Sequence, residues 1–394
     1  MDTRTGLPIV GMVGGGQLAR MTHQAAIALG QSLRVLAVGE GESAGLVAAD
    51  VTHGHHTDLD ALRTFARGVD VLTFDHEHVP GEHLRALADE GVVVRPGPGA
   101  LAHAQNKLLM RERMASLGLP NPAFVEVKQV SDAVKFGDDH GWPAILKAAT
   151  GGYDGKGVWQ LDSADEARAQ IPELLDAGMS LLIEERVPMA RELSALVARS
   201  PFGQGAAWPV VETVQSDGIN TEVLAPAPGL SEAGTQRAQG LALRIAEQLD
   251  VAGVMAVELF ETHEGGLVIN ELAMRPHNSG HWTMDGSRTS QFEQHMRAVL
   301  DYPLGTTDLL SPTVMANVLG APETPTMSVD ERLHHLYARY PDVKVHLYGK
   351  SERPGRKLGH VNVGGPIDES TRAKARVAAH WLSAAEWPDG YSIH

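Results

Sequence analysis

Two strongly apolar segments joined by a short polar turn constrain this chain more than any other feature. Residues 254–260 and 267–272 are rich in β-branched and aliphatic side chains, and His-Glu-Gly-Gly at 263–266 has the composition of a tight turn. The pattern predicts a β-hairpin. Its register follows if Glu264 and Gly265 are the two turn residues.

The predicted hairpin carries two carboxylates that this register brings together. Glu258 would face Glu271 across the two strands. Opposed side chains lie about 5 Å apart, where like charges repel, so the pair needs a counter-ion. With oxygen ligands only, and Asn270 as a third donor, the expected ion is Mg²⁺, which leaves positions for water and substrate phosphates. The alternative is a register shifted by one residue, with one glutamate simply solvated.

Composition excludes several classes of protein. The 394 residues are enough for two or three domains with their own cores. A net charge of −16 argues against nucleic acid or an anionic membrane as the main partner. The chain has no cysteine, which excludes disulfides, thiolate metal sites and cysteine nucleophiles. Without an apolar run of 18 residues or a cleavable leader, we expect a soluble, cytoplasmic protein.

The first 80 residues alternate strands and helices. Apolar runs predict strands at 7–13, 33–38 and 69–74, with a helix from the glycine turn to Leu29. This order predicts a parallel sheet with ligands at the carboxyl ends of its strands. Gly14, Gly16 and Ala19 fit a dinucleotide-binding pattern, and Glu40 stands at the offset of a ribose contact. A nicotinamide-dependent dehydrogenase is therefore one alternative, although a glycine turn before a helix suits any phosphate.

The loops of this region contain several histidines and one notable acid. Glu77 comes just after the third strand, where such sheets place ligand contacts; a solvated or capping acid is the alternative. We interpret the neighbouring histidines as solvated loop residues rather than a metal cluster: His53, His55, His56, His76 and His78.

The middle of the chain has features of a phosphate site. A break at 95–99 and a helix from 101 to 117, which carries Lys107, mark a domain boundary. Residues 142–149 predict a strand in which Lys147 stands between apolar neighbours and so requires an anion. The next segment, TGGYDGKGV at 150–158, offers backbone N–H groups and one lysine to a polyphosphate, but it is not a Walker A sequence; an empty glycine hairpin is the alternative.

A second strand of this region, 181–187, begins apolar and ends polar. Such a strand end can present backbone N–H and C=O groups to a purine edge between apolar walls. On the following strand, Glu192 points to the same side as Ser194 and Leu196. Glu192 could accept hydrogen bonds from ribose hydroxyls, or it is an exposed strand acid.

Taken in order, these residues resemble the ATP-grasp ligases. Four motifs are similar to those of N5-carboxyaminoimidazole ribonucleotide synthetases of purine biosynthesis, and the similarity covers nearly the whole chain: GGGQLARM at 14–21, FDHEHVP at 74–80, RPHNSGHWT at 275–283 and YGKSERPGRKLGHVN at 348–362. This chain has Asp75 where the family often has Glu, Lys107 where it often has Arg, and Gln215 where it usually has His.

The resemblance implies a mixed α/β and α+β fold. We expect a Rossmann-like pre-ATP-grasp domain at 1–104, an ATP-grasp domain at 105–304 with a lid subdomain at about 122–190, and a small β-rich C-terminal domain at 305–394. It also implies a homodimer.

The implied activity is an ATP-dependent carboxylation with Mg²⁺ as cofactor. Bicarbonate attacks the γ-phosphate of ATP to give ADP and carboxyphosphate. 5-Aminoimidazole ribonucleotide (AIR) then takes the carboxyl group as phosphate leaves, either directly or through released CO₂. The nearest alternative is another ATP-grasp acyl-phosphate ligase, such as formate-dependent glycinamide ribonucleotide transformylase.

Site residues are assigned accordingly. We expect Glu258 and Glu271 to bind the metal, and Arg275, His277 and Lys350 to act in catalysis. The residues expected around ATP are Lys107, Lys147, Gly152, Tyr153, Asp154, Gly155, Lys156, Gly157, Glu184, Glu185, Arg186, Val187, Glu192, Gln215, Asn270 and Glu271. Those expected around AIR are Gln17, Leu18, Glu77, Tyr153, Asp154, Asn278, Lys350, Arg353 and Arg356.

Overall fold

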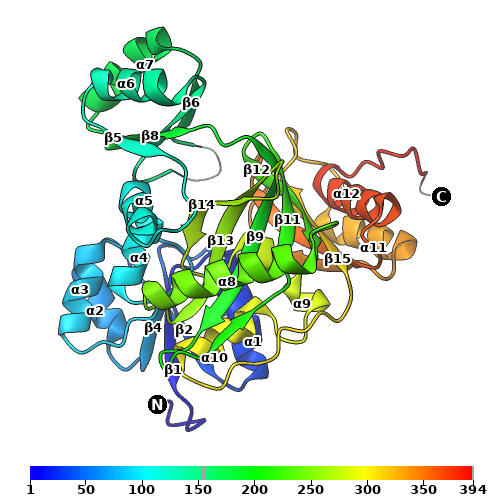
Figure 1. Ribbon diagram of the computed structural model, residues 1–394. Helices are drawn as coiled ribbons and strands as arrows, with labels where there is room; N and C mark the ends of the chain where they lie inside the picture. The colour runs from blue at the N-terminus through cyan, green and yellow to red at the C-terminus, as the bar shows by residue number, and fades with distance from the viewer. Residues whose placement is uncertain (153–155, 393–394) are drawn as a thin grey trace.

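The computed structural model describes residues 1–152 and 156–392, which form three sheets surrounded by helices (Figure 1). The first sheet contains β1 (Ile9–Val13), β2 (Ser32–Ala37), β3 (Val51–His53) and β4 (Val71–Phe74), with α1 (Gln17–Ala28), α2 (Leu59–Ala66) and α3 (Gly81–Asp89) around it. Its strands are parallel in the order β3-β2-β1-β4, so the predicted parallel sheet is confirmed. The sequence did not predict β3, because three partly polar residues carry no recognisable alternation.

Nine of the described strands form an antiparallel sheet at the centre of the molecule. They are β9 (Met189–Arg199), β10 (Gly205–Ala207), β11 (Val211–Ser216), β12 (Ile219–Ala225), β13 (Gly253–Thr262), β14 (Leu267–Ala273), β15 (Thr313–Leu319), β16 (Lys344–Leu347) and β17 (Lys357–Gly364). The order is β14-β13-β9-β11-β12-β15-β17-β16, with β10 paired to β9.

The two faces of this central sheet have different neighbours. Helix α8 (Glu232–Gln248) lies across one face (Figure 1) and packs on alternate residues of β9 and β13, among them Leu193 and Val257. Since successive side chains of a strand point to opposite faces, Glu192 and Glu258 lie on the other face. That face carries the site described below.

The second four-stranded sheet, called the small sheet below, stands apart from the centre, at the top of Figure 1. It contains β5 (Phe124–Val127), β6 (Ala144–Ala148), β7 (Val158–Leu161) and β8 (Leu181–Glu185), with α6 (Val130–His140) and α7 (Ala164–Asp176). The order is β5-β8-β6-β7, and its apolar residues form a core of their own. These elements fall within 122–190, the predicted lid subdomain.

The helix predicted from 101 to 117 is wrong as a single helix. Two helices take its place, α4 (Pro98–Gln105) and α5 (Lys107–Ser116). Asn106 between them has extended backbone angles, and its side chain accepts a hydrogen bond from Leu109 N at 3.1 Å. Asparagine favours such a cap over a helix interior, so the helix restarts with Lys107 in its first turn.

The last quarter of the chain continues the central sheet. After η1 (Asn278–Gly280), α9 (Thr283–Gly286) and α10 (Gln291–Val299), β15, β16 and β17 extend the sheet, and α11 (Val329–Arg339) and α12 (Glu369–Ala384) complete a core with them. The boundary predicted at 304–305 therefore falls between α10 and β15, and the sheet runs across it. None of the helices in the described ranges is long and apolar enough to cross a membrane.

Candidate active site

The hairpin of β13 and β14 pairs the two glutamates, but through a different turn from the predicted one. Its loop has three residues: Gly265 N donates to Thr262 O and Thr262 N donates to Gly266 O, both at 2.9 Å. This shifts the register by one residue near the turn, and a β-bulge after Glu258 shifts it back. The predicted two-residue turn is wrong, whereas the predicted pairing of Glu258 with Glu271 is confirmed.

The carboxylate pair is contacted by one lysine and one histidine. Lys107 Nζ lies 2.6 Å from Glu271 Oε1, and His277 Nε2 lies 3.4 Å from Glu258 Oε1. Burial, helped by the charge of nearby Arg275, lowers the pKa of His277 to about 3, so this ring is neutral. Burial and the facing Glu271 raise the pKa of Glu258 well above its ordinary value. Two opposed carboxylates with oxygen donors only fit a hard divalent cation such as Mg²⁺.

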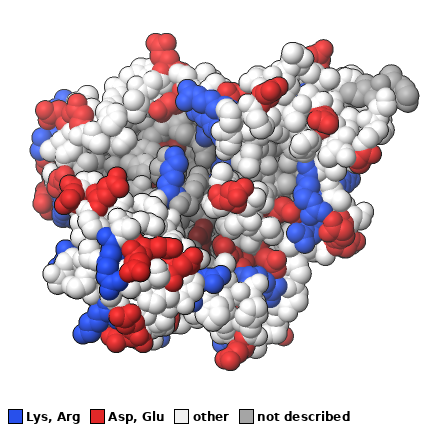
Figure 2. Space-filling view, turned by 90° about the horizontal axis from the view of Figure 1, so that it is seen from above, with Lys and Arg blue, Asp and Glu red and all other residues white. Residues whose placement is uncertain are grey.

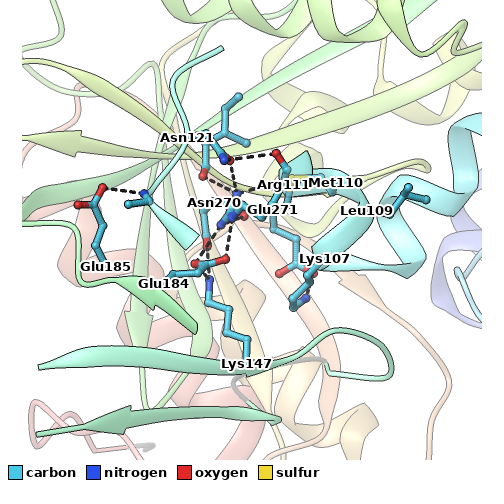
Figure 3. Close-up of polar contacts among 12 residues, drawn as sticks. Lys107, Leu109, Met110, Arg111, Asn121, Lys147, Glu184, Glu185, Asn270 and Glu271 are labelled. Atoms are coloured by element: carbon cyan, nitrogen blue, oxygen red, sulfur yellow. Dashed lines mark hydrogen bonds and ion pairs between the residues drawn. The ribbon is translucent and has the colours of Figure 1, made fainter. Parts of the chain in front are cut away.

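Lys147 has the anionic partner that its buried position requires (Figure 3). Its Nζ lies 2.8 Å from Glu184 Oε2, and it donates to Asn270 Oδ1 at 3.3 Å. Burial lowers the pKa of Lys147. The small sheet, which carries Lys147 and Glu184, therefore meets the carboxylate hairpin at this point.

One fully buried residue of this cluster was missed from the sequence. Arg111 on α5 pairs with Glu184, its Nε lying 2.6 Å from Glu184 Oε1. It follows Lys107 by four residues, the spacing of neighbours on one helix face. The predicted helix of 101–117 contains both residues at this spacing, so this signal was available.

The glycine-rich segment connects β6 to β7 beside Lys107. Ala148 N donates to Gly157 O at 2.8 Å, which closes the hairpin. A Cβ atom on Gly152 would lie 2.7 Å from the carbonyl oxygen of Lys156 and 4.0 Å from Lys107 Cε, so the backbone passes close to this lysine. Three predicted ligands lie outside the described residues: Tyr153, Asp154 and Gly155.

The residues predicted around the nucleoside differ in their surroundings. Gln215 Nε2 donates to Glu192 Oε2 at 3.2 Å, and burial raises the pKa of Glu192, so these two lie together. Glu185 Oε1 accepts a hydrogen bond from the backbone N–H of Ala123 at 3.0 Å, which ties the strand end to the linker before β5. At the end of β8, Arg186 is exposed and Val187 half-buried.

A second polar cluster lies where α1 meets the loop after β16. Lys350 Nζ donates to Gln17 Oε1, and Leu18 packs in a small core that includes Tyr348. Burial, with the neighbouring Arg356 charge, lowers the pKa of Lys350 to about 8. Two segments 333 residues apart in sequence therefore form one site. From above, the molecule has a hollow near its centre with basic and acidic side chains close together (Figure 2).

Arg275 connects the two clusters. Its Nε lies 2.6 Å from Glu77 Oε2, and both Glu77 and Glu271 help to raise the pKa of Arg275 above its ordinary value. Glu77, predicted to bind AIR, and Arg275, predicted to act in catalysis, thus form an ion pair. Both side chains are about four-fifths buried.

Asp75 is the second residue that sequence reasoning missed. Gly16 N donates to Asp75 Oδ2 at 2.6 Å, while Asp75 Oδ1 is buried and makes no hydrogen bond with any described residue. A Cβ on Gly14 would lie 1.8 Å from that oxygen. Burial raises the pKa of Asp75 to about 6. The sequence contained a signal for Asp75. The parallel neighbours β1 and β4 end at Val13 and Phe74, so the residues that follow, Gly14 and Asp75, lie side by side.

This arrangement argues against dinucleotide binding by the glycine turn. The N–H that would hold a pyrophosphate is bonded to a carboxylate of the protein, and Glu40 is exposed. Glycine at positions 14 and 16 leaves room for the Asp75 carboxylate, because a Cβ atom at either position would clash with it.

Three residues predicted around AIR make other contacts or lie at the surface. Asn278 Oδ1 accepts from Asn317 Nδ2 at 2.8 Å and from Asn220 Nδ2 at 3.2 Å, so its amide belongs to an internal network. Arg356 Nη1 donates to Ser351 Oγ at 2.7 Å. Arg353 is exposed.

The histidines of the first sheet are less solvated than predicted. His53, His55 and His78 are exposed, but His56 and His76 are half-buried with ring centres 4.6 Å apart, and burial lowers the pKa of each to about 4. Among the described residues, no group of three or more histidine or acidic side chains is placed to hold a metal ion.

Comparison with known proteins identifies the family. Residues 7–105 match the ribonucleotide synthetase preATP-grasp domain, 112–292 the ATP-grasp domain, and 313–374 the phosphoribosylaminoimidazole carboxylase C-terminal domain. N5-carboxyaminoimidazole ribonucleotide synthase of Mycobacterium tuberculosis is 59% identical over 98% of this chain and 90% of its own. The chain belongs to the N5-carboxyaminoimidazole ribonucleotide synthase family. It is accordingly an ATP-grasp ligase with the pre-ATP-grasp, ATP-grasp and C-terminal parts that the resemblance implied.

Solved structures of this family agree with the fold. An ADP complex of N5-carboxyaminoimidazole ribonucleotide synthetase has a TM-score of 0.87 at 34% identity, covering 98% of this chain and 100% of its own. The enzyme from Aspergillus clavatus, in complex with ADP and 5-aminoimidazole ribonucleotide, has a TM-score of 0.86 at 31% identity, covering 95% and 98%. The family match also decides against the formate-dependent transformylase alternative.

Proposed function

We propose that this chain binds MgATP and bicarbonate at the carboxylate hairpin, binds AIR between Gln17 and Lys350, and passes the carboxyl group from one end of the site to the other. As a member of its family, the enzyme carboxylates AIR at the expense of ATP in purine biosynthesis. The observation that carries the proposal is the position of Arg275, which is ion-paired to Glu77 and close enough to Glu271 to respond to its charge.

The first half-reaction is a phosphoryl transfer. Bicarbonate oxygen attacks the γ-phosphorus of ATP, the bond to the β,γ-bridging oxygen breaks, and ADP and carboxyphosphate result. Lys107 and Lys147, which lie beside Glu271 and Glu184, would face the phosphates, where their charge would offset the negative charge of the transition state. Mg²⁺ held by Glu258 and Glu271 would supply further neutralisation of the phosphate oxygens. Arg275 can hold bicarbonate through a bidentate pair. His277 Nδ1 accepts from Ser279 N, so the neutral ring carries its hydrogen on Nε2 and can position bicarbonate as a hydrogen-bond donor.

The second half-reaction is an acyl transfer to nitrogen. The amine of AIR attacks the carboxyl carbon, either of carboxyphosphate or of CO₂ released from it, and phosphate leaves. The amine must give up one proton, and Asp75 Oδ1 is a buried acceptor without a hydrogen bond to any described residue. A carboxylate with a pKa near 6 is a suitable base at neutral pH. Arg353 and Arg356, nearer the surface, suit the 5′-phosphate.

The remaining assignments stay predictions. A lid over carboxyphosphate at 151–157 remains a prediction from the sequence, and residues 153–155 of that segment lie outside the described ranges. The domain boundaries at 104 and 304, the homodimer and the cytoplasmic location are predictions from the sequence.

The direct test is a coupled assay of ADP release. With MgATP present, ADP release should require bicarbonate and should increase when AIR is added, with N5-carboxyaminoimidazole ribonucleotide as the product. ADP release that depends on formate instead of bicarbonate would refute the proposed reaction.

Arg356→Met tests the division of the site. Loss of a charged hydrogen-bond donor should raise the KM for AIR about tenfold and change the KM for ATP by less than about twofold. Arg288→Met, an exposed arginine beside Asp308, is the matched control and should change neither constant. Equal increases in both KM values would contradict the assignment of this loop to AIR.

The pH dependence should report both ends of the AIR site. Asp75 must be ionised to accept a proton, so kcat/KM for AIR should fall as the pH drops through about 6. Lys350 must be charged to hold an anion, so the same constant should fall as the pH rises through about 8. Lys350→Arg should shift only the alkaline limb upwards, because arginine stays protonated. An unchanged alkaline limb in that variant would exclude Lys350 as its source.

A further inference from the structure

Arg111 is fully buried and uses its whole guanidinium fork inside the protein (Figure 3). Its Nε and Nη2 donate to the two oxygens of Glu184 at 2.6 and 3.2 Å. Nη1 donates to Ile269 O at 2.9 Å and to Asn121 Oδ1 at 3.2 Å, and Nη2 also donates to Asn270 O at 2.8 Å. One side chain therefore joins α5, the small sheet, the linker before it and the carboxylate hairpin.

The backbone contacts fall on the bulge of β14. Glu258 pairs with Glu271 and Leu259 pairs with Ile269, so the bulge leaves Asn270 outside the pairing with β13. β14 is also the edge strand of the described sheet, so β13 is its only neighbour there. The two carbonyl groups at the bulge receive their donors from Arg111 instead. The bulge is the feature that restores the pairing of the metal carboxylates, so its geometry matters for the site.

The charges give the second argument. Glu184 carries one negative charge and lies between two cations, Arg111 at 2.6 Å and Lys147 at 2.8 Å. The buried triad therefore has a net charge of +1, which favours an anion nearby. If Arg111 were neutral, Lys147 and Glu184 would form a neutral pair.

We propose that Arg111 is a positioning residue of the ATP site. It neutralises Glu184, so that the positive charge of Lys147 is not cancelled inside the protein and can act on the phosphates. It also holds the bulge that presents Asn270 and Glu271. This role rests on the proposed function, in which Lys147 and the hairpin bind the nucleotide. Arg111 itself contacts protein groups and acts through Lys147 and Asn270.

The test measures nucleotide affinity without turnover. Mg-ADP binding by calorimetry, together with the KM values for ATP and AIR, is compared in the wild type, Arg111→Met and Arg111→Lys. Arg111→Met should raise the Kd for Mg-ADP and the KM for ATP about 10- to 100-fold, with the KM for AIR changed less than about twofold. Arg111→Lys keeps the charge but lacks the fork, so it should recover part of the affinity and stay about tenfold weaker than the wild type.

Two controls separate this inference from the function beneath it. Arg113→Met removes an arginine of the same helix that donates to the backbone oxygen of the exposed Gln248 at 3.2 Å, and this variant should bind nucleotide normally. Lys147→Met should weaken Mg-ADP binding at least as much as Arg111→Met. If Lys147→Met binds normally, the proposed nucleotide site is wrong, whatever Arg111 does.

The remaining outcomes decide the role of Arg111. Wild-type affinity in Arg111→Lys would refute the positioning of the bulge and leave charge alone as its role. If both Arg111 variants bind Mg-ADP with wild-type affinity while Lys147→Met is impaired, the inference is wrong. It is also wrong if the KM values for ATP and AIR rise equally, because that result indicates a general structural role for Arg111. If circular dichroism shows that Arg111→Met is unfolded, Arg111→Lys carries the test by the same criteria.

Discussion

Glu271→Gln should lower kcat about a thousandfold while the protein stays folded. Glutamine has the shape of glutamate, and its carbonyl oxygen can still accept the hydrogen bond from Lys107, which Glu271 Oε1 accepts at 2.6 Å. What is lost is one of the two charges that face each other on the hairpin. Removing it also relieves repulsion of Glu258, so stability should stay equal or rise while Mg²⁺ binding weakens.

The measurement is ADP release as a function of Mg²⁺ concentration, with the unfolding temperature recorded in parallel. Glu264→Gln is the matched control, because Glu264 is exposed at the turn of the same hairpin. It should have normal kcat and normal Mg²⁺ dependence. A near-normal rate in Glu271→Gln would remove the metal site from the hairpin.

Asp75→Asn should separate the two half-reactions. Asparagine keeps the size of the side chain and can still accept the hydrogen bond from Gly16 N, but it cannot take up the proton of the AIR amine. Product formation should therefore fall about 100- to 1000-fold. Bicarbonate-dependent ADP release without AIR should remain, because the phosphate lysines and the hairpin are unchanged.

Both activities are followed in one preparation, ADP by a coupled assay and the carboxylated ribonucleotide by chromatography. Asp89→Asn, an exposed acid at the end of α3, is the control and should leave both rates unchanged. Parallel loss of the two rates would show that Asp75 supports the whole site rather than proton transfer. An unchanged product rate would remove it from the reaction.

Local patterns in the sequence predicted eight of the 17 described strands and the pairing of Glu258 with Glu271. The pairing was reached with an incorrect turn, because a three-residue loop and a bulge shift the register in opposite directions. A bulge adds one residue to a strand without visibly interrupting the alternation of apolar and polar residues. The alternation therefore cannot reveal a bulge. The helix break at Asn106 was missed for a related reason, since a cap in the middle of an apolar-periodic segment depends on one side chain.

The site residues that were missed share a physical cause. Arg111 and Asp75 are charged residues whose partners lie far away in sequence, at Glu184 and at Gly16. Periodicity and composition describe neighbours along the chain, so they cannot tell a buried charge from a solvated one. Conversely, Lys147 was identified because it stands inside an apolar strand, where the local sequence itself reveals the cost of burial.

The central sheet links the edge strand β14 to the strands β16 and β17 that flank the Lys350 loop. In the proposed function, the phosphoryl donor binds beside β14 and the nitrogen acceptor beside the Lys350 loop, so this continuous sheet would set the distance between the two substrates. The small sheet does not pair with it. Side-chain contacts of Arg111, Glu184 and Lys147, rather than strand pairing, therefore join the small sheet to the hairpin.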